Sequence, residues 1–337
     1  MRRLFLFSLL LIGFAQAEFD KVATTAAPFL KLPVGGRANA MGGAFVALAD
    51  DGFASYWNPA GMSAAEGTTI SASHSDWLLD ISLDHMGLIL PTRPNEWFGL
   101  SVTSLSMGDQ LVRTIEEPEG TGLEYGVQDL ALSASYTRQI TDRLAVGSSA
   151  KMIHLQAYNE TAQTFAIDLG SILRTNFYGM KIGMALSNFG GDILFKGRDL
   201  IIDADISDDL DGNYRSDADL RTESWPIPLM IRIGVSMDLL GGEDAPLKSQ
   251  SSRLTLALDA DHPNDGPEHL NLGLEYGLRE MFYFRGGYRH NYDQENGTLG
   301  TGVRLPLAGA GTLVVDYAVK PMKVLGNTSI LSLSYTR

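Results

Sequence analysis

The titratable residues of this chain do not form a pattern typical of an enzyme. The six histidines are scattered, at positions His74, His85, His154, His262, His269 and His290. None of them belongs to an H-E-x-x-H pair, which would place two zinc ligands and a general base on one helix. No G-x-S-x-G turn is present to expose a nucleophilic serine, and the absence of cysteine excludes disulfides and thiolate chemistry. We therefore expect no catalytic residues, no cofactor and no thiolate metal site.

Residues 189–224 hold the densest acidic cluster, with ten aspartates and glutamates diluted by four basic residues. The stretch Asp209-x-Asp211-Gly212 is similar to part of a calcium-binding loop. An EF-type loop with this glycine at its sixth position requires glutamate at position 218, where Ala218 stands. We expect a solvated loop. Weak calcium binding that bridges to lipopolysaccharide is the alternative.

Two glycine pairs, Gly35-Gly36 and Gly42-Gly43, could suggest a phosphate-binding loop. No buried strand precedes them, and no Gly-Lys-Ser or Gly-Lys-Thr follows. The formal net charge of -14 also argues against a nucleic-acid partner, which requires a basic surface.

The first seventeen residues predict an export signal. Arg2 and Arg3 precede an apolar run from Leu4 to Phe14, and Ala15-Gln16-Ala17 matches a signal-peptidase cleavage site. The run is shorter than the ~20 residues that a membrane-spanning helix needs. We expect a Sec-type signal peptide over 1–17, cleavage before Glu18, and a mature protein beyond the inner membrane.

The rest of the chain alternates with a period of two, which is typical of strands. In Leu270–Leu278 one face carries leucine and tyrosine, and the other carries asparagine, glutamate and glycine. The run from Pro228 to Asp238 repeats the pattern. A soluble sandwich with one wet face also alternates, but apolar faces four or five residues deep suit the ~25 Å apolar band of a membrane barrel.

Segments of this kind predict about fourteen strands, an even number as expected for a bacterial single-chain barrel. The predicted strands are 67–74, 81–90, 97–107, 127–139, 143–156, 162–173, 177–187, 227–238, 252–261, 268–278, 281–290, 297–305, 311–320 and 328–336. Short turns alternate with longer connections, of which Gly108–Gly126 and Phe189–Trp225 are the longest. A barrel with short periplasmic turns and long extracellular loops has this asymmetry.

Charged residues of both signs fall on the glycine-bearing faces of these strands, which would face the lumen. The candidate lumen network consists of Asp168, Lys181, Arg232, Asp259, Glu275, Arg285, Arg289 and Asp316, and the same faces carry Asp129, Lys151, Asp238 and Arg304. Buried charges must pair or stay hydrated. We interpret them as a structural network that holds an internal segment, and a substrate path through the barrel is the alternative.

Residues 18–66 do not alternate and are rich in small side chains, as a compact plug requires. Asn39 to Ala49 predicts a short helix that ends at the Asp50-Asp51-Gly52 turn. Asn58-Pro59-Ala60-Gly61 predicts a turn in which Pro59 holds Asn58 extended. The candidate plug motif is Gly35, Gly36, Arg37, Met41, Gly42, Gly43, Asp50, Asp51, Trp57, Asn58, Pro59 and Gly61.

This segment resembles the N-terminal signature of the PorV/PorQ family, within the wider FadL-like outer-membrane proteins. The matching stretches are Arg37-Ala38, Met41 to Ala47, Ala49-Asp50-Asp51 and Tyr56 to Gly61. The resemblance implies a 14-stranded transmembrane antiparallel β-barrel over residues 67–337, plugged by residues 18–66, in the outer membrane of a Gram-negative-type bacterium. The C-terminus departs from common barrels, because it ends Ser334-Tyr335-Thr336-Arg337 rather than on an aromatic residue.

The resemblance also implies two functions. PorV-like barrels are non-enzymatic components of the type IX secretion system that receive cargo proteins, whereas FadL-like channels pass hydrophobic compounds across the outer membrane. The expected partners are outer-membrane lipids and lipopolysaccharide, together with secretion-system proteins or cargo, or a hydrophobic ligand. A transporter requires an apolar pocket between the N-terminal segment and the wall, whereas a secretion component requires a blocked lumen and a recognition surface on its outer loops.

Overall fold

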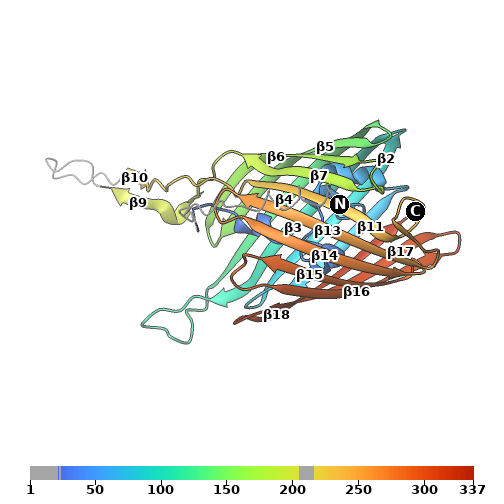
Figure 1. Ribbon diagram of the computed structural model, residues 1–337. Coiled ribbons are helices and arrows are strands. Elements are labelled where there is room, and N and C mark those ends of the chain that lie inside the picture. Colours follow the sequence, from blue (N-terminus) through green and yellow to red (C-terminus); the bar gives the residue numbers. More distant parts are fainter. Residues whose placement is uncertain (1–21, 23, 205–215) are drawn as a thin grey trace, which may run out of the picture.

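The chain forms a closed antiparallel β-barrel (Figure 1). The computed structural model describes Val22 and residues 24–204 and 216–337. Strand β1 (Thr69–Asp76) pairs with β2 (Ile81–Arg93) on one side and with β18 (Gly326–Thr336) on the other, which closes the ring. The remaining wall strands are β3 (Glu96–Leu111), β4 (Glu124–Thr141), β5 (Leu144–Ala157), β6 (Glu160–Arg174), β7 (Lys181–Gly190), β11 (Met230–Gly241), β13 (Ser252–Pro263), β14 (His269–Leu278), β15 (Phe282–His290), β16 (Gly297–Leu307) and β17 (Gly311–Met322).

These fourteen long strands confirm the barrel that the alternation predicts. Four short strands lie outside the main ring. Strand β8 (Lys196–Gly197) pairs with β6, β12 (Leu247–Lys248) pairs with β11, and β9 (Ile201–Ala204) forms a hairpin with β10 (Ser216–Asp219) after the 3-10 helix η3 (Arg198–Leu200). Two predicted boundaries were wrong by four residues: the strand expected to end at 107 continues to Leu111, and the strand expected from 177 begins at Lys181. Tyr178 and Gly179 have positive φ angles of 49° and 64°, so this stretch is a turn.

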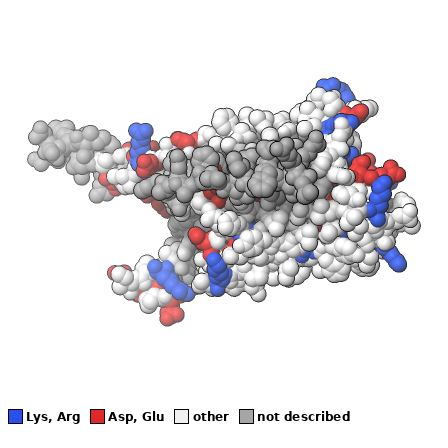
Figure 2. Space-filling model, in the orientation of Figure 1, with Lys and Arg blue, Asp and Glu red and all other residues white. Residues whose placement is uncertain are grey.

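The two faces of the wall strands differ as the alternation predicts. On β14, Leu270, Leu272 and Leu274 are exposed on the outside, whereas Asn271 and Glu275 are buried in the lumen. Figure 2 shows the acidic and basic side chains mostly toward the two ends of the molecule, with uncharged residues over much of the wall between them. An apolar band between charged ends is the surface that a bilayer requires of a barrel. Within the described part of the chain, the helices are all too short or too polar to cross a membrane.

The residues before β1 form four short helices inside the barrel. They are η1 (Pro28–Lys31), α1 (Gly36–Ala40), α2 (Ala54–Trp57) and η2 (Pro59–Ala64). We call residues 24–66 the N-terminal segment, and Figure 1 shows it in blue within the ring of strands. Its apolar side chains form the main buried cluster together with wall residues such as Leu83, Ile89 and Trp97.

The helix expected over Asn39 to Ala49 was wrong in its extent. Helix α1 ends at Ala40, and Gly42 and Gly43 follow with φ angles of 68° and 83°. These left-handed conformations end the helix, and glycine adopts them without steric cost. The turn after Asn58 agrees with the sequence, because Asn58 is extended and η2 begins at Pro59.

The connections differ in length between the two ends of the barrel. The long connections after β3 and β7 project from one end, at the left of Figure 1, and the C-terminus lies at the other, among short turns. We call these the long-loop end and the short-turn end. The expected signal peptide, 1–17, lies outside the described residues. So does 205–215, which includes the calcium-like motif of Asp209, Asp211 and Gly212.

Candidate functional site

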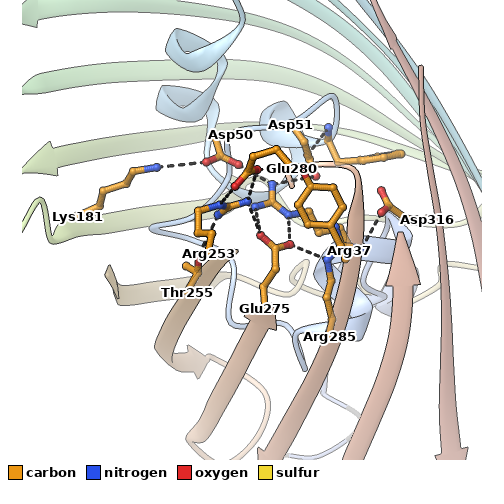
Figure 3. Close-up of polar contacts among 12 residues, drawn as sticks. Arg37, Asp50, Asp51, Lys181, Arg253, Thr255, Glu275, Glu280, Arg285 and Asp316 are labelled. Carbon is orange, nitrogen blue, oxygen red and sulfur yellow. Dashed lines mark hydrogen bonds and ion pairs between the residues drawn. The ribbon is translucent and has the colours of Figure 1, made fainter. Parts of the chain in front are cut away.

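Arg37 of helix α1 joins the N-terminal segment to the barrel wall. Its Nε and Nη2 atoms donate to the two carboxylate oxygens of Glu275 on β14, at 2.7 and 3.0 Å, and its Nη1 donates to Asp50 at 2.6 Å (Figure 3). A planar guanidinium that meets a carboxylate through two parallel bonds is both strong and directional. The pair therefore fixes the position of α1 against one wall strand.

Glu275 is the centre of this cluster. Besides Arg37, its carboxylate accepts from Arg285 Nε of β15 at 2.6 Å and lies 3.1 Å from Arg253 Nη2 of β13. Arg285 continues the chain of charges to Asp316 of β17 at 2.6 Å. The carboxylate of Glu275 is only 1% exposed, and several cationic partners compensate a buried charge of this kind.

The pKa values of Asp50 and Asp51, two neighbouring residues of the N-terminal segment, are shifted in opposite directions. Burial alone would raise the pKa of Asp50, but Arg37 and Lys181 outweigh it and lower this pKa to about 2. Lys181 of β7 lies 3.2 Å from the Asp50 carboxylate, on the other side from Arg37. For Asp51 burial dominates and raises the pKa to about 6, because Arg37 is 4.0 Å away.

A polar cavity of about 380 Å³ adjoins this cluster. Strand residues near the short-turn end, including Thr69, Thr312 and Thr336, line it together with the four arginines Arg37, Arg253, Arg285 and Arg304. Such a lining suits water or a charged group rather than a hydrophobic compound.

A second attachment holds the middle of the N-terminal segment. The buried carboxylate of Asp259 on β13 accepts from the backbone N–H groups of Phe45 and Val46, at 2.6 and 2.7 Å. Both N–H groups donate to the same carboxyl oxygen, Oδ2. The turn after α1 is thus fixed by a residue more than two hundred positions away.

The Asn58-Pro59 turn makes the third attachment. Asn58 Nδ2 donates to the carbonyls of Val46 and of Ser171 on β6, at 2.9 and 3.1 Å, while its Oδ1 accepts from Ala60 N. The carbonyl of Pro59 accepts from the hydroxyl of Thr137 on β4. Gly61 lies so close to the Ala49 carbonyl that a β-carbon would come within 1.9 Å of its oxygen, so no larger residue fits here without a shift.

The other predicted motif residues also lie at close contacts. Gly36 N donates to Ser332 Oγ of β18 at 2.9 Å, and Gly35 packs against the ring of Phe53. Met41 is fully buried beside Gly273, and Gly43 lies near Trp57. The indole N–H of Trp57 donates to the Val34 carbonyl at 3.1 Å.

The predicted lumen charges form separate groups rather than one network. Lys181, Glu275, Arg285 and Asp316 belong to the Arg37 cluster, and Asp259 holds the Phe45–Val46 turn, as described above. Asp168 pairs with Lys151 at 2.7 Å. Arg232 lies 3.9 Å from Asp261 and 5.3 Å over the Trp57 ring. Arg289 pairs with Glu295 and lies over the ring of Tyr292, toward the long-loop end.

Several contributors were missed in the sequence. Arg253, Asp261 and Lys320 were not among the predicted residues, and Lys320 pairs with Glu295 at 3.0 Å. Alternation along the strands could have identified these three residues. Arg253 and Asp261 are an even number of positions from Asp259, and Lys320 is an even number from Asp316, so each lies on the same strand face as a predicted lumen residue. Glu280, which pairs with Arg253 at 2.9 Å, follows β14 in a turn, where strand phase gives no information.

The sequence matches the family described as "Type IX secretion system protein PorV" over residues 15–199. None of the curated proteins matches it.

Solved structures with a similar fold are barrels of the FadL type. A Pseudomonas aeruginosa FadL homologue has a TM-score of 0.54 and 13% identity, with 90% of this chain and 98% of that chain covered. The Ralstonia pickettii toluene transporter TbuX has a TM-score of 0.51 and 14% identity, with 90% and 97% covered. The CymD monoaromatic hydrocarbon channel has a TM-score of 0.54 and 13% identity, with 90% and 97% covered. At such identities the likeness concerns the fold.

Proposed function

The chain belongs to the PorV family of type IX secretion system proteins, and from this premise we propose that it is a plugged, non-enzymatic barrel of the outer membrane that docks secretion partners or cargo through its long-loop end. In this proposal the N-terminal segment is the plug and the Arg37 cluster is its principal attachment. The exposed apolar band of the wall supports the membrane location. The sequence of residues 1–17 supports export by a Sec-type signal.

The observation that carries the proposal is the way the lumen is filled. Asp259 and Glu275 tie the N-terminal segment to the adjacent strands β13 and β14, and Asn58 ties it to β6. Hydrogen bonds to Ser332 of β18 and from Thr137 of β4 add attachments farther around the ring. Between these attachments the segment buries Phe45, Phe53 and other large side chains almost completely. A barrel filled in this way is better suited to present its outer surface to proteins than to conduct solutes.

Exposed apolar side chains at the long-loop end support protein docking. Ile115 in the connection after β3 is fully exposed, Leu79 between β1 and β2 is 89% exposed, and Val324 between β17 and β18 is 81% exposed. The proposal assigns these three side chains to the contact with a protein partner, because the buried centre of a protein interface is more apolar than the rest of the surface.

Secretion of a cargo protein tests this function. We expect the triple variant Leu79→Ser, Ile115→Ser, Val324→Ser to lower cell-surface delivery of a reporter carrying a type IX sorting domain at least tenfold, in a strain that lacks the native barrel. The matched control is Ile140→Ser at the short-turn end, where Ile140 is 53% exposed. Both variants should keep the heat-modifiable gel migration of a folded barrel. Undiminished delivery by the triple variant contradicts docking through these tips.

A channel for hydrophobic small molecules is the second candidate, and the fold shared with the toluene transporter TbuX favours it. It predicts that cells expressing the chain take up a radiolabelled monoaromatic compound faster than cells without it. Uptake together with normal cargo delivery by the triple variant would favour the channel over the secretion component.

A further inference from the structure

The structure shows why glycine, rather than a larger residue, occupies lumen-facing positions of the wall. A β-carbon on Gly287 of β15 would come within 2.2 Å of the Gly42 nitrogen, and one on Gly273 of β14 would come within 2.6 Å of the Met41 carbonyl oxygen. The N-terminal segment approaches the wall too closely there for any side chain. Glycine within a strand commonly marks such a close approach of another backbone or of a ligand.

Two glycines that face outward have no such neighbour. Gly286 lies on the outer face of β15 between Phe284 and Tyr288, and a β-carbon there would meet nothing closer than 3.7 Å. Gly297 on β16 pairs with Tyr288, and a β-carbon there would meet nothing within 4 Å. Glycine in a strand interior weakens the strand, so Gly286 gives up stability without an internal contact that requires it. Gly297, the first residue of β16, leaves the adjoining outer surface open in the same way.

The missing side chains leave a groove of about 840 Å³ in the outer wall. Its sides are leucines of three strands and Tyr288: Leu256 is partly buried, while Leu272, Leu274, Tyr288 and Leu299 are 42–67% exposed. The groove crosses the long-loop half of the wall between β13 and β17. Its lining is apolar, its width is set by the two glycines, and it faces the side of the wall that a bilayer covers.

The end of the groove nearest the long-loop end of the barrel is polar. Gln294, Asn296 and Lys323 line it, and Gln294 Oε1 is a buried acceptor with no hydrogen-bond partner among the described residues. Lys323 donates its ammonium group to the Asp293 carbonyl at 2.9 Å, so its charge lies at the same rim. An acceptor and a cation above an apolar channel complement a lipid whose head group offers N–H or O–H donors and a phosphate.

We propose that this groove binds one acyl chain of lipid A, the membrane anchor of lipopolysaccharide, in the outer leaflet. The acyl chain lies over Gly286 and Gly297, between the leucine side chains that form the two sides of the groove. The hydroxyl or amide group near the head of that chain donates to Gln294 Oε1, and a phosphate meets Lys323. A glycerophospholipid offers the phosphate but no hydroxyl or amide donor on its acyl chains, which is why the buried acceptor favours lipid A. The proposal requires the long-loop end to lie outside the cell, and it is independent of any role in secretion.

Native mass spectrometry of the full barrel in dimyristoyl phosphatidylcholine nanodiscs with added lipid A tests the proposal. We expect the wild-type protein to retain one lipid A molecule per barrel, and Gly286→Phe to retain at least tenfold less because its ring fills the groove. Gly297→Phe repeats the test at a site with open space, should the first variant not give a folded, heat-modifiable barrel. Lys323→Ala should lower retention of lipid A but not of phosphatidylcholine.

The matched control is Ala72→Phe, which adds the same ring at an outward position of β1, away from the groove. It should retain lipid A as the wild type does. Equal retention by the wild type and the folded glycine variants overturns the proposal, as does equal loss in Ala72→Phe. Displacement of lipid A by an equimolar amount of dimyristoyl phosphatidylethanolamine overturns the choice of lipid A as the occupant.

Discussion

At the residue scale, Glu275 links three arginines from different parts of the chain. Arg37 belongs to the N-terminal segment, while Arg253 and Arg285 belong to two wall strands. A buried carboxylate in this position attracts each of the three arginines and so offsets the repulsion between them. Its removal leaves buried positive charges near one another, which is more costly than the loss of a single pair.

We therefore expect Glu275→Gln to destabilise the folded barrel by about 3 kcal/mol, at the lower end of the usual range for breaking a buried pair. The lower end applies because Arg37 keeps Asp50, and Arg285 keeps Asp316. Urea unfolding in lipid vesicles, followed by tryptophan fluorescence, measures the change. Glu280→Gln, in the exposed turn, should have a much smaller effect, and equal effects of the two variants would contradict a central role for Glu275.

Asp51 makes stability depend on pH with a definite sign. Its pKa is about 6 in the folded chain, above the ordinary value of 3.8. Ionisation therefore costs the folded state stability, and this cost is absent below about pH 4 and complete above about pH 6. A shift of roughly two units corresponds to about 3 kcal/mol.

We expect Asp51→Asn to stabilise the barrel at pH 7 by about 2–3 kcal/mol, and to have little effect at pH 3.5, where the wild-type carboxyl is protonated as well. Asparagine can still accept from Phe53 N as Asp51 does. The same urea titration at both pH values measures the difference. A stabilisation that is equal at both pH values would show that ionisation of Asp51 is not its cause.

At the element scale, the wall could be predicted from the sequence because strand periodicity is local. A residue's face follows from its phase within one strand, so Glu275 and Asp316 could be assigned to the lumen without knowledge of their partners. The partners themselves could not be assigned, because contacts with Arg253 and Arg285 depend on the register of the neighbouring strands, and the contact with Arg37 depends on the path of the N-terminal segment. Arg253 was missed although its phase was readable, and its contact with Glu275 depends on the neighbouring strand.

The N-terminal segment was predicted less well, for a physical reason. Its conformation is set by contacts with the wall, such as Asp259 with Phe45 and Val46, and not by local propensity. Residues 39–49 have the small side chains of a helix, but the chain turns at Gly42 and Gly43, where it meets Gly287 and the neighbouring strand. The glycine pair was a local signal for the end of the helix, because glycine adopts these left-handed conformations without steric cost. The path of the residues that follow depends on the tertiary contacts.

Asp259 provides a test of the attachment of this segment to the wall. We expect Asp259→Ala to loosen the turn at Phe45, because two buried N–H groups lose their acceptor. A variant that lacks residues 18–60 should show a large steady conductance in planar bilayers, because the lumen is then open. Asp259→Ala should show more frequent conducting events than the wild type, and its conductance should approach that of the deletion variant.

The control for this experiment is Asp238→Ala on β11. The carboxylate of Asp238 accepts from Thr255 of the wall, so its removal should leave the conductance unchanged. A wild-type barrel that already conducts as strongly as the deletion variant would contradict the role of residues 18–66 as a plug.

At the scale of the whole molecule, the two ends of the barrel have different chemistry. The short-turn end holds the arginine-lined cavity and the C-terminus, whereas the long-loop end carries the protruding connections with Ile115, Leu79 and Val324. Both the docking proposal and the lipid A groove require the long-loop end to face the outside of the cell. Short periplasmic turns and longer extracellular loops are the usual arrangement of bacterial barrels.

Two glycines allow this orientation to be tested with matched insertions. Gly122, in the connection after β3, and Gly309, in the turn between β16 and β17, have φ angles of 78° and 72°, and a β-carbon on either would meet nothing within 4 Å. An epitope tag at either position should therefore leave the barrel folded, because exposed loop positions tolerate insertion. We expect the tag at Gly122 to bind antibody on intact cells and the tag at Gly309 to bind only after the outer membrane is permeabilised. The reverse result would invert the barrel, and it would remove both the proposed docking surface and the outer-leaflet position of the groove.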